Sequence, residues 1–216
     1  MSKYLRFIFQ IWFLLASITF ALSAQSAVIP GKCLSYEVQG NKAVFSCENN
    51  IKVQLEQVSS GILKIWYDQD NFKQNNESFV VIKKGDESAK LNVSEQPLSF
   101  EIYTGDLIVR INKSPFQIRI FDKYQKLLME DFINRGFEKD SLKMSSYKTL
   151  RPGERIYGLG EKNGPINRVG SRFRMWNSDK PCYDIHEDPL YKSIPFFISS
   201  AGYSIFFDNT YKTEYD

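Results

Sequence analysis

The sequence predicts an all-β protein, an antiparallel β-sandwich, on three observations. Apolar residues alternate with polar ones along many short segments, as at Ile51, Val53 and Leu55, and this period of two is typical of strands with one buried face. Turn-forming Gly, Asn, Ser and Asp residues separate these segments at intervals typical of sandwiches. Helical periodicity is weak: residues 126–138 show some, but Gly136 favours a loop or one short helix there.

The β-rich segments follow one another from residue 34 almost to the last residue. The stretch Asn112-Lys113-Ser114-Pro115 predicts a turn between two alternating runs, and Ser200-Ala201-Gly202 predicts another. Aromatic residues make up 15% of the chain, and packing in a core accounts for most of them. Strands are expected over residues 34–38, 43–47, 51–55, 63–67, 79–83, 99–103, 107–111, 116–121, 155–158, 172–176 and 203–207.

Residues 1–24 have the organisation of a secretory signal peptide, which leaves residues 25–216 for the β-sandwich domain. A short basic start precedes the apolar run 7–22, and small residues at 23–27 offer a cleavage site. The alternative is an uncleaved membrane anchor, because the apolar run approaches the length that spans a bilayer. The sequence therefore predicts export to the periplasm or the medium.

Charge excludes one class of partner. The formal net charge is +3, and removing Lys3 and Arg6 with the leader lowers it to about +1. The remaining basic residues form no stripe that would follow a phosphate backbone, so a nucleic-acid partner is not expected.

The cysteines and the single histidine bear on metals and disulfides. Cys33 and Cys47 flank a predicted hairpin, and export would permit a disulfide between them, although two separate buried thiols fit equally well. Cys182 is left over, in a predicted loop. The cysteine spacing does not suit zinc, so neither a metal site nor a cofactor is expected.

Four blocks in the last third of the chain carry a family resemblance. They are Tyr157-Gly158-Leu159-Gly160-Glu161, Met175-Trp176-Asn177-Ser178-Asp179, Leu190 to Phe197, and Tyr203 to Asn209. As an ordered set they resemble the end of the N-terminal domain of glycoside hydrolase family 31, the retaining α-glucosidases and α-xylosidases. The resemblance extends over residues 38–216.

The resemblance implies a β-sandwich of the galactose-mutarotase-like type that precedes a catalytic (β/α)8 barrel. Retaining glycosidases use two carboxyl groups, and in this family both aspartates lie on the barrel. The sequence contains no family catalytic motif, so no catalytic residue is assigned. We therefore expect the front piece of an exported α-glucosidase-like enzyme, inactive alone. Its partners would be an α-glucoside or related oligosaccharide and the barrel that this chain lacks.

Asp179 is the leading candidate for a substrate-binding residue. In the family, the loop with the Trp-Asn-x-Asp motif reaches the barrel mouth and helps to shape the sugar pocket, and Asp179 matches that aspartate. A carboxylate accepts hydrogen bonds from sugar hydroxyls, whereas the alternative is a turn aspartate that caps its own backbone. Trp176 is a weaker candidate, because an exposed ring stacks on sugars but most rings here belong to a core.

Other functions remain as alternatives. A free-standing carbohydrate-binding β-sandwich would share the fold without catalysis, and an α-xylosidase would share the family. A mutarotase-like epimerase would need histidine and carboxylate partners. His186 has Asp184, Glu187 and Asp188 nearby, but residues adjacent in a loop seldom converge, and a polar surface loop explains them.

Overall fold

The structure is a computed structural model that describes residues 27–69, 78–82, 85, 90–140 and 143–216. It confirms the all-β prediction: the described residues form sixteen strands and a single 3-10 turn at Glu48–Asn50. The predicted signal peptide, residues 1–24, lies outside the described residues. Within those described ranges, no helix has the length and apolar character needed to cross a membrane.

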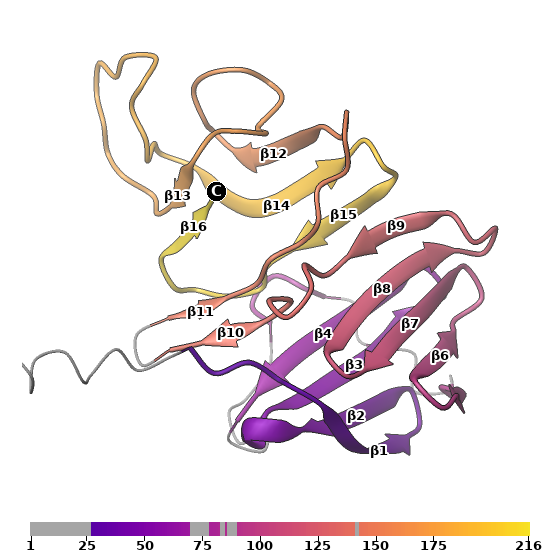
Figure 1. The fold of residues 1–216 in the computed structure, drawn as a ribbon. Coiled ribbons are helices and arrows are strands. Elements are labelled where there is room, and N and C mark those ends of the chain that lie inside the picture. Colours follow the sequence, from indigo (N-terminus) through magenta and orange to yellow (C-terminus); the bar gives the residue numbers. More distant parts are fainter. Residues whose placement is uncertain (1–26, 70–77, 83–84, 86–89, 141–142) are drawn as a thin grey trace, which may run out of the picture.

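Two antiparallel sheets form the sandwich (Figure 1). One sheet has four strands and the other has five, and in both sheets strands adjacent in sequence are adjacent in space. The first sheet contains β1 (Cys33–Gln39), β2 (Lys42–Cys47), β3 (Lys52–Ser59) and β4 (Ile62–Asp68). The second contains β5 (Val93–Glu95), β6 (Ser99–Tyr103), β7 (Leu107–Lys113), β8 (Phe116–Asp122) and β9 (Leu127–Glu130).

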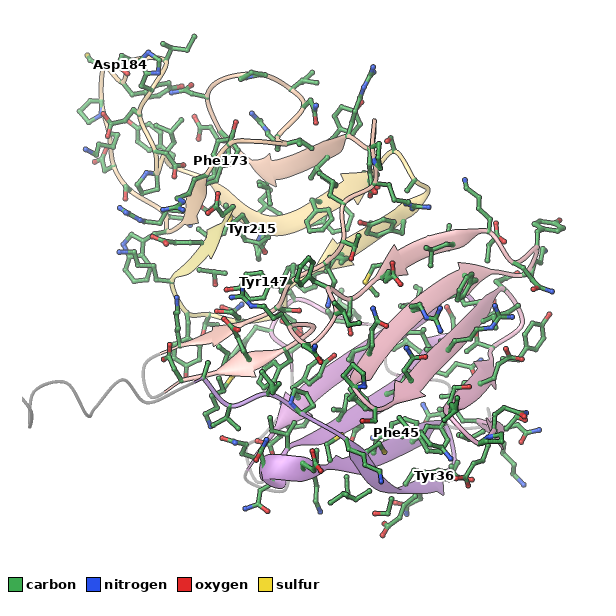
Figure 2. The ribbon with its side chains drawn as sticks, in the orientation of Figure 1. Tyr36, Phe45, Tyr147, Phe173, Asp184 and Tyr215 are labelled. Carbon is green, nitrogen blue, oxygen red and sulfur yellow. The ribbon has the colours of Figure 1, made fainter. Side chains whose placement is uncertain are left out.

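The main core lies between these two sheets, and the alternation in the sequence accounts for it. Phe45 of β2 lies 5.2 Å, between ring centroids, from Phe100 of β6 and 6.1 Å from Phe116 of β8. Val53 and Leu55 of β3 are fully buried beside them, while the polar residues between them are not. Tyr36 of β1 is partly buried and packs against this core, and Figure 2 labels it near Phe45. Burial of one face of each sheet is the main source of stability here.

A hairpin of β10 (Glu138–Lys139) and β11 (Met144–Ser145) lies beside the sandwich. The Asp131 side chain, 2% exposed, connects this region to the core: its carboxylate accepts hydrogen bonds from the Ile118 backbone N–H and from Lys148. Burial and the nearby Asp131 carboxylate raise the pKa of Tyr67, whose ring stacks on Phe137 at 4.5 Å. The buried charge is therefore fully compensated, as burial of a carboxylate requires.

The last third of the chain forms a second, smaller layered unit (Figure 1). One sheet has the order β12-β14-β15, and β13 pairs with β16. Leu159, Phe173 and Met175 form a small core of their own. The strands are β12 (Ile156–Gly160), β13 (Phe173–Met175), β14 (Ser193–Ser199), β15 (Tyr203–Phe206) and β16 (Thr213–Tyr215).

A polar junction joins the smaller unit to the sandwich. The Arg151 guanidinium donates to the backbone carbonyls of Leu127 and Leu128 at the end of the second sheet. Glu154 accepts hydrogen bonds from the Ser199 hydroxyl and from the Arg151 backbone N–H. Burial would raise the pKa of Glu154, but these hydrogen bonds outweigh burial and lower it.

Two sequence-based predictions of elements were wrong. Residues 126–138 were predicted to be a loop or one short helix. Instead Leu127–Glu130 pairs with β8 and forms strand β9. The predicted strand at 79–83 is not a strand over its described residues, 79–82. Phe79 and Ile82 are 93% and 96% exposed there. An apolar run forms a strand only when a neighbouring strand is available to pair with it.

Candidate functional site

The loop that carries the predicted site residues connects β13 to β14, and we call residues 176–192 the Asp179 loop. Its two ends are tied together beside the strands. The backbone N–H of Trp176 donates to the Ser193 hydroxyl at 3.1 Å, and the Ser193 N–H donates to the Asn177 side chain at 2.7 Å. The Ser178 N–H then donates to the Leu190 carbonyl at 2.9 Å. These bonds close the base of the loop and fix where it leaves the sheet.

A buried lysine fixes the loop from below. The Lys162 side chain is 0% exposed, and its ammonium donates to the Asp188 carboxylate at 2.7 Å, the Arg174 carbonyl at 2.6 Å and the Ser193 hydroxyl at 3.3 Å. The second oxygen of Asp188 accepts the Arg174 backbone N–H at 2.6 Å. All three ammonium protons therefore have acceptors, which is the condition for burying a charge.

The Gly158-Leu159-Gly160 segment brings Lys162 to that position. We predicted a tight strand-end turn here, but the structure has a bulge inside the β12–β14 pairing, with φ of +119° at Gly158 and +80° at Gly160. A Cβ at Gly160 would lie 2.5 Å from the Lys192 carbonyl oxygen. Glycine is required because the neighbouring backbone occupies the space of a side chain.

Asp179 is exposed and belongs to a cluster of carboxylates and phenols at the loop. Partial burial, together with the charge of Asp179 and a hydrogen bond to it, raises the pKa of Tyr191. The Tyr191 ring contacts that of Tyr183 edge-on at 6.3 Å, and the Tyr183 hydroxyl donates to Glu161 at 3.3 Å. Exposed carboxylates beside phenolic hydroxyls offer acceptors and donors to sugar hydroxyls.

Trp176 lines a hollow of about 340 Å³. The Trp176 side chain is 54% exposed and Tyr211, on the same hollow, is 81% exposed. Asp179 does not line this hollow, so the structure does not bring the two predicted site residues into one pocket. The lining residues are Met175, Trp176, Asn177, Ser193, Pro195, Asn209, Thr210, Tyr211 and Thr213.

The acidic residues around His186 have separate structural roles. Asp184 accepts the backbone N–H of His186, Glu187 pairs with Lys180 at 3.0 Å, and Asp188 pairs with the buried lysine. They do not converge, in agreement with the interpretation of a polar loop. Figure 2 shows Asp184 at the far end of the loop, well away from the sandwich. No grouping of His, Cys, Asp and Glu suited to a metal ion occurs among the described residues.

Sequence reasoning missed the residues that support Asp179. Lys162 was not singled out, because a lysine between Glu161 and Asn163 looks like a surface residue. Tyr191 is twelve positions from Asp179 in the sequence, and no periodic pattern relates the two. The signal that could have found Lys162 was the pair of close-packing glycines before it, which indicates a chain segment held tightly against a neighbour.

The fold and this loop define a β-sandwich domain of the type found in carbohydrate-active proteins. Residues 52–216 match the model of the glycosyl hydrolase 31 N-terminal galactose mutarotase-like domain. The chain belongs to glycoside hydrolase family 31, as the four sequence blocks predicted. The same match confirms the galactose-mutarotase-like type of the sandwich.

Similar proteins agree with this assignment. A dextranase of this family from Flavobacterium johnsoniae, solved with isomaltotriose, is 54% identical, with a TM-score of 0.81 over 87% of this chain and 23% of its own. Alpha-glucosidase 2 of Bacillus thermoamyloliquefaciens is 29% identical over 80% of this chain and 22% of its own length. An alpha-xylosidase of Emericella nidulans is 34% identical over 39% of this chain and 13% of its own.

The chain thus spans less than a quarter of the length of these relatives. The comparisons support the glycosidase-domain hypothesis and not the free-standing binding module. They also support a hydrolase at the level of the family.

Proposed function

We propose that this chain is the N-terminal domain of a longer, retaining hydrolase of α-linked glucosides, and that the Asp179 loop lines the sugar-binding pocket of that enzyme. The observation that carries the proposal is the set of hydrogen bonds and the ion pair that fix the Asp179 loop. A largely buried ion pair and a closed base hold the loop that carries the exposed Asp179 carboxylate. A loop held this firmly positions a polar group for recognition at little further entropic cost.

Asp179 would accept hydrogen bonds from the hydroxyls of a glucose unit, and Tyr191 would orient the carboxylate. Burial and the Asp179 charge raise the pKa of Tyr191, so its phenol keeps its proton and can donate beside the carboxylate. A pocket built to bond a hydroxyl discriminates strongly against a ligand that lacks it, because the acceptor is then left unpaired. The residues that break the glycosidic bond, an acid/base and a nucleophile, would come from the barrel.

The substrate class follows from similarity to the dextranase. That protein binds isomaltotriose and shares 54% of its residues with this chain over the matched region. We therefore favour a glucan or gluco-oligosaccharide over a xyloside. Trp176 would supply an apolar ring for a pyranose face at the hollow that it lines, which Asp179 does not line.

The test uses the 216-residue chain and a longer protein that contains it. The chain alone should not hydrolyse 4-nitrophenyl α-glucoside or isomaltotriose, whereas the longer protein should hydrolyse both. Turnover by the chain alone that survives Asp179→Ala would contradict the proposal. Calorimetric titration of the chain with isomaltotriose separates the alternatives, because a self-sufficient binding module would bind it tightly and a partial pocket would not.

We also propose that the protein is exported. The basic start, the apolar run at 7–22 and the small residues at 23–27 support cleavage of a leader. Intact-mass measurement of the mature protein tests this. A chain that starts within 23–28 agrees with export, and a chain that retains residue 1 in the membrane fraction would indicate an anchor instead.

A further inference from the structure

The first two strands of the sandwich contain an irregularity that concerns two cysteines. From Ser35 onward, β1 and β2 pair in one register, with Ser35 opposite Ser46 and Tyr36 opposite Phe45. Continued without a break, this register would place Leu34 opposite Cys47. Instead a β-bulge shifts the pairing by one residue, and Cys33 lies opposite Cys47.

The bulge exchanges a leucine for a cysteine on the core side. Because side chains alternate along a strand, a regular β1 would point Leu34 to the same face as Tyr36 and turn Cys33 away. In the structure Cys33 and Cys47 are each 5% exposed and belong to the core, while Leu34 is 63% exposed. Exposing a leucine loses burial energy. In exchange, the shifted register places the two buried cysteines directly opposite each other.

Both sulfurs are free thiols in the structure, and the Cys33 thiol donates a hydrogen bond to the Ser35 carbonyl at 3.4 Å. The neighbouring Cys47 thiol lowers the pKa of Cys33, and the Cys33 thiol raises the pKa of Cys47. Directly opposed residues of an antiparallel pair have Cα atoms about 4.5–5.5 Å apart, within the range of about 4.4–6.8 Å that a disulfide spans. A thiolate is the attacking species in disulfide exchange, so Cys33 is the better placed of the two to start it.

We propose that Cys33 and Cys47 form a cross-strand disulfide when the chain folds in an oxidising compartment. The reaction is a two-electron oxidation: the thiolate of Cys33 attacks a disulfide-containing oxidant, breaks its S–S bond, forms a mixed disulfide and releases the first half of the oxidant as a thiolate, which takes up a proton. The thiol of Cys47 loses its proton, attacks the Cys33 sulfur and releases the second half of the oxidant as a thiol. The protein is oxidised by two electrons and the oxidant is reduced to two thiols. The proposal goes beyond glycoside hydrolysis and uses the proposed export only as the source of oxidant.

The bond would fasten an edge of the sandwich. Among the residues that the structure describes, strand β1 pairs with β2 alone in its sheet. The preceding segment is held by backbone bonds between Lys32 and Glu48 and between Val28 and Lys139. A covalent link at Cys33 would keep the start of β1 in place. It would also limit the conformations of the unfolded chain between Cys33 and Cys47, which stabilises the folded state. Cys182 is exposed and would remain a free thiol.

Thiol counting on the intact chain is the first test. The purified chain, denatured and reduced, is refolded in a mixture of oxidised and reduced glutathione, denatured again without reductant and titrated with a thiol reagent. The proposal expects one reactive thiol per chain and a peptide that links Cys33 to Cys47 in the mass spectrum. Three reactive thiols, or a link that includes Cys182, would overturn it. Because refolding in glutathione does not involve export, failure here leaves the proposed localisation and function untouched.

Thermal unfolding with and without reductant gives a second, independent readout. The oxidised chain should melt about 5–10 °C above the reduced chain. Under oxidising conditions Cys33→Ala, Cys47→Ala and the double variant should all lose this increment equally, since either change removes the bond. Cys182→Ala is the matched control and should melt like the wild type. Equal melting of the wild type with and without reductant would overturn the proposal.

Discussion

Replacing the buried lysine tests whether an internal ion pair holds the Asp179 loop. In Lys162→Met the side chain keeps its length and apolar stem but loses the ammonium group. The change removes hydrogen bonds to the Asp188 carboxylate, the Arg174 carbonyl and the Ser193 hydroxyl, made at 2.7, 2.6 and 3.3 Å. The carboxylate then remains in the protein without its cation.

The magnitude follows from burial. Removing one member of a buried ion pair typically costs about 3–5 kcal/mol, because the other charge stays desolvated. The Lys162 side chain is 0% exposed but that of Asp188 is 20% exposed, so water relieves part of the penalty and about 3 kcal/mol is the better figure. For a domain of this size that corresponds to a fall in Tm of roughly 6–12 °C.

Lys180→Met is the matched control, because Lys180 lies in the same loop and pairs with Glu187 at 3.0 Å in an exposed setting. An exposed pair contributes less than about 1 kcal/mol. Urea unfolding gives the free energies of unfolding, and hydrogen exchange of the 176–192 amides reports the order of the loop. Equal losses in the two variants, or unchanged exchange in Lys162→Met, would refute the reasoning. A double variant, Lys162→Met with Asp188→Asn, should recover part of the loss, since no uncompensated charge remains.

Two further predictions concern the backbone of β12 and the junction with the sandwich. Gly160→Ala should destabilise the fold by more than about 2 kcal/mol, since it adds a clash with the Lys192 carbonyl to the strain of a positive φ. Gly164→Ala, with φ of +84° and open space around its Cβ, should cost only the strain, about 1 kcal/mol, and equal losses in chemical denaturation would contradict this account. For Glu154, whose folded pKa is lowered, the stabilisation is present above its ordinary value of 4.5 and is lost as the pH falls through the folded value. Melting curves against pH should therefore show Glu154→Gln less stable than the wild type at pH 7 and the difference shrinking below about pH 4, and a constant difference would exclude this role.

The sandwich was predictable because its strands follow one simple rule. Ile51, Val53 and Leu55 alternate with polar residues, and burial of every second side chain is what a half-buried strand requires. The alternation rule predicted a strand at 79–82, where the structure has exposed apolar residues and no strand. It predicted no strand at 127–130, because Gly136 favoured a loop or a short helix there. In both places the outcome depended on whether a partner strand was nearby, which local sequence does not encode.

The candidate site was predictable only in part. The family motif identified Asp179, and the structure leaves that side chain exposed, as a pocket role requires. The supporting contacts of Lys162 and Tyr191 join residues distant in sequence and depend on the folded path of the chain. The residues directly beside Lys162 and Lys180 do not reveal that the first lysine is buried and the second exposed; only the two glycines before Lys162 hint at it.

The most direct test of the central claim is the activity of the longer enzyme after Asp179→Asn, with Asp184→Asn on the same loop as the control. Hydrogen bonds to a charged acceptor contribute about 1.5–3 kcal/mol, so kcat/KM for isomaltotriose should fall roughly 10- to 150-fold in the first variant. The second should stay within about twofold of the wild type, because Asp184 accepts the His186 N–H within the loop and an asparagine oxygen would do the same. An Asp179→Asn enzyme with unchanged kcat/KM would contradict the account.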